Sequence, residues 1–85
     1  MNLQKDPEFV ADYLNGMIVQ QILTVMADGK IKGTVLAEKL GMTWLMVYKL
    51  LNESEPLTLP DIARFCCALD CNVEVVIKKE KDDEN

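Results

Sequence analysis

The chain has 85 residues and a formal net charge of −5, and 49% of its residues are hydrophobic. This size and apolar content suit one domain with a modest core and argue against a disordered chain. No apolar run approaches the roughly 20 residues needed to cross a bilayer, and residues 1–6 lack the layout of a signal peptide. We therefore expect a cytoplasmic protein.

The sequence gives no indication of catalytic chemistry. It contains no histidine, which removes the usual general base, and no glycine-rich phosphate loop or nucleophile elbow. Three cysteines, Cys66, Cys67 and Cys71, lie close together, but no histidine or second cysteine pair completes a four-ligand metal site. We expect reduced cysteines that serve as small core residues, with one of the adjacent pair Cys66 and Cys67 partly exposed, and we expect no metal, no cofactor and no enzymatic activity.

The first predicted element is one long amphipathic helix that ends near residue 28. Asp6 is a suitable cap, Pro7 suits the first helical position, and Glu8 complements the positive end of the helix dipole. Gly16 is a candidate for a kink or a division into two helices. Apolar residues recur in steps of three and four, at Phe9, Val10, Tyr13, Leu14, Met17, Ile18, Ile22, Val25 and Met26.

Two short helices follow, over residues 34–40 and 44–52. Gly41 is expected to end the first in a left-handed conformation, and Thr43 is expected to cap the second. The buried positions predicted for the pair are Leu36, Ala37, Leu40, Val47 and either Leu50 or Leu51.

The last predicted helix begins after Thr58, with Asp61 as its capping-box partner. Its expected inner face consists of Ile62, Phe65, Cys66 and Leu69. The β-branched run over residues 73–78 predicts a short strand, and residues 79–85 form a charged tail. We expect a single domain over residues 1–78, followed by the flexible tail.

The two short helices and their glycine turn have the pattern of a helix-turn-helix over about residues 34–52. Ala37 is small where the two helices are expected to cross, Gly41 permits the tight turn, and Val47 and Leu50 anchor the second helix. From Ile31 to about Cys71 the chain resembles the Cro/repressor-type (XRE-type) helix-turn-helix family. The resemblance rests on residues 36–43 at the turn and on residues 57–71 at the last helix.

This resemblance implies an all-α, lambda-repressor-like bundle of four to five helices, here with a short C-terminal β-strand. It also implies that the helix over residues 44–52 lies in the major groove of double-stranded DNA. Carried onto this sequence, the DNA-binding residues are Lys32, Thr34, Thr43, Trp44, Leu45, Tyr48, Lys49 and Asn52.

The roles implied for these residues divide between phosphates and bases. Lys32 and Thr34 would hold flanking phosphates, Thr43 would bind a phosphate, and Lys49 would reach a phosphate or a guanine. Asn52 would contact an adenine or the DNA backbone.

The distribution of charge along the chain supports the prediction that these residues bind DNA. Residues 30–49 hold four lysines against Glu38 alone, a local charge of +3 in an acidic chain. A local positive potential attracts a phosphate backbone whatever the net charge, although lysines on solvated faces also explain such a segment.

Three features depart from the family pattern. Gly33 stands where a phosphate-binding glutamine is common, Asp70 replaces a frequent glycine after the last helix, and the run from Trp44 to Tyr48 is largely apolar where polar residues are usual. This run has three interpretations: a groove-reading face, a protein-binding patch, or a surface packed against the chain's own first helix.

Two functional hypotheses follow. The first is a sequence-specific DNA-binding regulator of transcription, either a repressor or an antitoxin-like autorepressor, since the opening and closing segments resemble antitoxins and small phage or plasmid regulators. The second is a helix-turn-helix used as a protein-interaction module, such as an antirepressor or a toxin-neutralising partner. The long first helix and the edge of the predicted strand also favour a homodimer.

Overall fold

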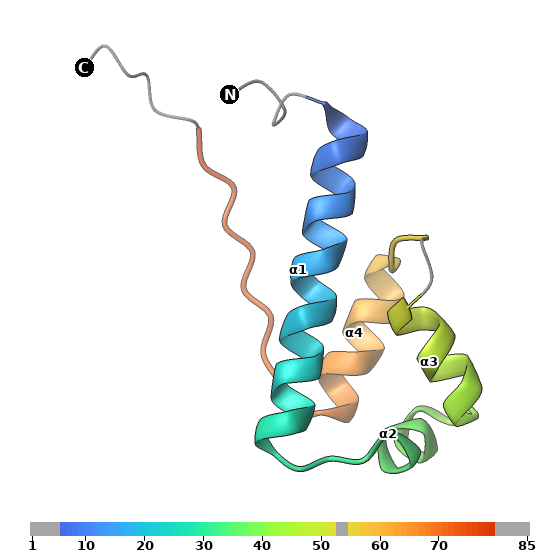
Figure 1. Cartoon of the computed structure of the whole chain (residues 1–85). Coiled ribbons are helices and arrows are strands. Elements are labelled where there is room, and N and C mark those ends of the chain that lie inside the picture. Colours follow the sequence, from blue (N-terminus) through green and yellow to red (C-terminus); the bar gives the residue numbers. More distant parts are fainter. Residues whose placement is uncertain (1–5, 53–54, 80–85) are drawn as a thin grey trace.

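The structure is a computed structural model that describes residues 6–52 and 55–79. It contains four helices: α1 (Pro7–Asp28), α2 (Gly33–Leu40), α3 (Trp44–Asn52) and α4 (Leu59–Ala68). The lower part of α1 and the three shorter helices form the body of the molecule, and α1 extends beyond it (Figure 1). The all-α prediction is confirmed. Within the described ranges, no helix is long and apolar enough to cross a membrane.

Helix α1 begins and ends where the sequence predicts. The Asp6 side chain accepts a hydrogen bond from the Glu8 N–H at 3.1 Å, and Pro7 occupies the first turn. At the other end, the Gly29 N–H donates to the Val25 carbonyl at 3.0 Å. The helix runs through Gly16 without interruption, so it is not divided in two.

The turn between α2 and α3 has the predicted geometry. Gly41 has φ +70°, and its N–H donates to the Glu38 carbonyl at 3.1 Å. The Met42 N–H donates to the Ala37 carbonyl at 2.9 Å, which closes the end of α2. The Thr43 hydroxyl then accepts from the Met46 N–H at 3.2 Å, which starts α3.

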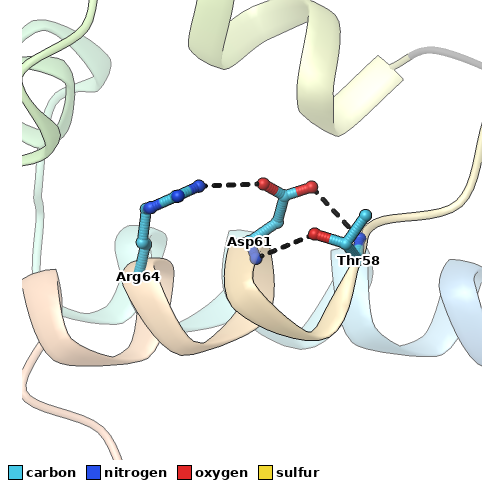
Figure 2. A network of polar contacts seen from close by, with 3 residues as sticks. All are labelled: Thr58, Asp61 and Arg64. Carbon is cyan, nitrogen blue, oxygen red and sulfur yellow. Dashed lines mark hydrogen bonds and ion pairs between the residues drawn. The ribbon is translucent and has the colours of Figure 1, made fainter.

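A reciprocal capping box starts α4 (Figure 2). The Thr58 hydroxyl accepts from the Asp61 N–H at 3.1 Å, and the Asp61 carboxylate accepts from the Thr58 N–H at 3.1 Å. The second carboxylate oxygen of Asp61 lies 3.3 Å from the Arg64 guanidinium. Because Arg64 is exposed, this ion pair adds little stability, and the two backbone hydrogen bonds fix the start of the helix.

The core lies where α2, α3 and α4 meet the second half of α1. Helix α2 contacts both α3 and α4, and Ala37 on it is 3% exposed, as expected for a close crossing. On α3, Leu51 is buried and Leu50 only partly so, which settles the predicted choice between them. The buried side chains of the core are Ile22, Met26, Leu36, Ala37, Val47, Leu51, Phe65 and Leu69.

The predicted C-terminal strand over residues 73–78 is wrong for this chain. Residues 71–79 are extended but form neither strand nor helix, and Val73, Val75, Val76 and Ile77 are exposed. The β-branched composition favours an extended backbone, but a strand also needs a neighbouring strand for its hydrogen bonds. The described part of the chain supplies none. Residues 80–85 of the predicted tail lie outside the described residues.

The apolar pattern of α1 does not form one buried face along the whole helix. The Asn15 side chain accepts a hydrogen bond from the Leu57 N–H at 2.8 Å, which ties the middle of α1 to the segment before α4. Beyond this point toward the N-terminus, α1 projects from the body (Figure 1). The apolar side chains there are exposed, apart from the half-buried Val10, so the core contacts of α1 come from its second half.

Candidate functional site

The outward face of α3 carries four of the predicted site residues. Leu45, Tyr48, Lys49 and Asn52 follow one another at the spacing of a single helix face and are all exposed. Val47 and Leu51 anchor the opposite side of α3 in the core. The buried side therefore holds α3 on the body while a mixed apolar and cationic face points to solvent.

Trp44 begins α3 and lies against the start of α2. A Cβ atom built on Gly33 would stand 2.5–2.7 Å from three atoms of the Trp44 six-membered ring, so the indole covers the Gly33 backbone. The ring remains 40% exposed and meets the Tyr48 ring edge-on, with 6.1 Å between centroids. This contact was not predicted from the sequence. The signal that could have indicated it is Gly33 itself, a residue without a side chain at the first position of α2.

The indole brings together the starts of two helices and the predicted phosphate-binding residues around them. Lys32 is the extended residue that precedes α2, and Thr34 is exposed in the first turn of that helix. Thr43 precedes α3, and its hydroxyl still has a hydrogen to donate while it caps the helix. Free N–H groups and the positive end of the helix dipole favour an anion at such positions.

Asn52 occupies the last position of α3, at the far end of the outward face. Its side-chain amide donates a hydrogen bond to the Tyr48 carbonyl at 2.9 Å. This intrahelical bond holds the amide against α3, so contact with a base would require the side chain to turn away from it.

The four lysines between residues 30 and 49 are all exposed, but they are not gathered in one place. Lys30 and Lys32 lie in the connection before α2, and Lys49 lies on the outward face of α3. Lys39, near the other end of α2, borders a shallow depression with Arg64 of α4. The one ion pair among residues 6–52 and 55–79 joins Asp61 and Arg64, so acidic side chains do not neutralise these lysines there.

The apolar run at the start of α3 is a surface feature. Leu45 is 61% exposed, and Met46 and Tyr48 are each 51% exposed. The interpretation in which this run packs against the first helix is therefore wrong, since Trp44 covers α2 and the other side chains face solvent. The groove-reading face and the protein-binding patch both fit this exposure.

The cysteines lie at the end of α4 and just beyond it. Burial raises the pKa of the Cys66 thiol, and the neighbouring Cys71 and Cys67 thiols raise this pKa further. Cys67 is exposed, and all three are free thiols. Among the described residues, no three His, Cys, Asp or Glu side chains are grouped as metal ligands.

Comparison with known proteins places this geometry in a family. A family model described as the Cro/C1-type HTH DNA-binding domain matches residues 21–82. The match covers the second half of α1, the helix-turn-helix and α4, and it leaves out the projecting first half of α1. Searches of curated proteins and of solved structures gave no match.

Proposed function

The chain belongs to the family of Cro/C1-type helix-turn-helix DNA-binding domains, and we propose that it is a sequence-specific regulator of transcription, a repressor or an antitoxin-like autorepressor. The observation that carries the proposal is the outward face of α3. Its side chains are exposed, and its opposite side is anchored by Val47 and Leu51. A helix mounted in this way can enter the major groove without disturbing the core.

The phosphate contacts of this proposal come from the residues around the start of α2 and from Lys49. Lys32, Thr34 and Thr43 surround the two helix starts that Trp44 brings together, and they would set the register on the backbone. Leu45 and Tyr48 would contact thymine methyl groups or base edges, so sequence preference would depend on apolar contact more than on hydrogen bonds. The protein would act as a homodimer, as readers of this class commonly do.

The test is selection from a pool of random DNA duplexes, followed by mobility-shift titration of the selected duplex at two salt concentrations. Lys32→Ala and Lys49→Ala should each weaken binding at low salt and reduce the salt slope by about 0.9 per lost phosphate contact. Lys79→Ala is the matched control, because Lys79 is an exposed lysine outside the surface. Leu45→Ala should change the selected sequence.

A second function is favoured by the exposure of Trp44, Leu45, Met46 and Tyr48. This apolar patch suits a protein partner, such as a toxin, and the chain would then be a neutralising partner or an antirepressor. No duplex enriched even at low salt, together with lysine variants that behave like the Lys79→Ala control, would remove the DNA-binding proposal and leave this one. Binding of a purified toxin from a neighbouring gene, lost in Leu45→Ala, would support it directly.

A further inference from the structure

Helix α1 has two apolar faces that point in opposite directions. Ile22 and Met26 are 5% and 8% exposed and belong to the core. Tyr13, nine positions before Ile22, is 60% exposed. Nine residues make about two and a half helical turns, so Tyr13 and Ile22 lie on opposite sides of α1. The body packs on the Ile22 side and leaves the Tyr13 side exposed, where Tyr13 and Met17 border an open hollow that Leu51 of α3 also lines.

The uncovered face is a continuous stripe on the projecting half of α1, which we call the α1 seam. Its side chains recur in steps of three and four, as in helices that pack along another helix. Contiguous exposed apolar side chains of this kind often mark a site of protein association. The α1 seam consists of Phe9, Val10, Tyr13, Leu14 and Met17, with exposed fractions of 42% for Phe9, 49% for Leu14 and 39% for Met17.

The α1 seam is complementary to a second copy of itself in the antiparallel direction. Val10, Leu14 and Met17 are separated by four and three residues, so a two-fold axis near Leu14 brings Val10 of one copy against Met17 of the other. Asp6 and Glu8 then lie at opposite ends of the pair. A parallel pair would instead bring the acidic ends and the positive ends of both helix dipoles together.

We propose that two copies of the chain associate through antiparallel packing of the α1 seam. One pair of helices is smaller than a standard interface of about 800 Å² per partner, so we expect a weak dimer whose population depends on concentration. The pairing depends on residues of α1 that the family match does not include. It is therefore a feature of this chain's own N-terminal half.

The antiparallel pair also gives a useful separation of the two bodies, an argument that rests on the proposed function. With a rise of about 1.5 Å per residue, the buried part of each α1 lies about 15 Å from the axis near Leu14. The two bodies are then about 30 Å apart along the pair, comparable with the roughly 34 Å between successive major grooves on one side of DNA.

Sedimentation equilibrium of the full chain without DNA tests the pairing. Leu14→Glu places a charge in the α1 seam and should raise the dimer dissociation constant at least tenfold. Leu59→Glu is the matched control, because Leu59 is 81% exposed on α4, outside the seam, and it should leave the dimer intact. Helical circular dichroism of each variant shows whether it is folded.

A charge exchange tests the direction of the pair. Val10→Glu alone should weaken the dimer, and Val10→Glu combined with Met17→Lys should restore it in part, because antiparallel packing sets these two positions against each other. Three results would overturn the proposal: a wild-type chain that remains monomeric at a concentration of about 100 μM, a dimer that Leu14→Glu does not weaken, or a double variant that dimerises no more tightly than Val10→Glu alone. A monomer that still selects a DNA sequence would contradict the pairing of α1 and leave the proposed function intact. A dimer without affinity for DNA would contradict the proposed function and leave the pairing intact.

Discussion

Replacing Gly33 with alanine tests the contact that joins the starts of α2 and α3. The new methyl group would stand 2.5 Å from the nearest atom of the Trp44 ring, where ordinary contacts begin at 3.4 Å. The indole must therefore retreat by about 1 Å or turn outward, and overpacking of this kind costs about 1–3 kcal/mol. Because the ring is 40% exposed and can move, we expect the lower part of that range.

The gain in helix propensity from glycine to alanine offsets part of this cost, by about 0.5–1 kcal/mol at most. The net loss is then at most about 1 kcal/mol, which lowers the melting temperature of a domain of this size by at most roughly 4–8 °C. Thermal melts followed by circular dichroism measure this loss. Trp44 is the chain's single tryptophan, so a red shift of its fluorescence would report the displaced ring directly.

Gly16→Ala is the matched control, since a Cβ atom there meets nothing within 4 Å. This exposed helical position should gain about 0.5–1 kcal/mol from the same substitution. Trp44→Ala in the Gly33→Ala background should remove the clash, so the two substitutions should not add. If Gly33→Ala raised the melting temperature as much as Gly16→Ala and left the fluorescence unchanged, the indole would not lie over Gly33.

Three further substitutions or reagents probe the rest of the site. Ala37→Leu should lower stability by about 1–3 kcal/mol in a denaturant titration, because Ala37 is buried where α2 meets its neighbours; an unchanged midpoint would show that the position has room. Thr43→Ala removes the hydroxyl that accepts from the Met46 N–H and should cost about 0.5–2 kcal/mol, with Thr43→Ser retaining most of the stability. Iodoacetamide at neutral pH should modify exposed Cys67 before Cys66, whose pKa is raised by burial. Mass spectrometry measures the labelling, and faster modification of Cys66 than of Cys67 would contradict this prediction. Because the pKa of Cys66 is higher in the folded chain, the stability that this thiol contributes is fully present below the ordinary thiol pKa and is lost as pH rises through the raised value.

Local chemistry determines most of the secondary structure of this protein. The starts of α1, α3 and α4 depend on Asp6, Thr43 and Thr58, each of which accepts a hydrogen bond from a backbone N–H two or three residues later. The end of α2 depends on the left-handed conformation of Gly41. Because both partners of these interactions lie within a few residues, the sequence alone predicts these helix boundaries and the turn of the helix-turn-helix.

Contacts between residues far apart in the sequence decided three features that the sequence pattern did not predict. Apolar residues recur in steps of three and four in both halves of α1, and the position of the body decides that the side carrying Ile22 is buried while the opposite side, which carries Tyr13, is exposed. The run from Val73 to Ile77 has strand propensity but no neighbouring strand in the described chain. The placement of the Trp44 ring over Gly33 depends on how α3 crosses α2, because the two residues are eleven positions apart in the sequence. Burial and pairing are properties of the assembled helices, so tertiary structure had to supply them.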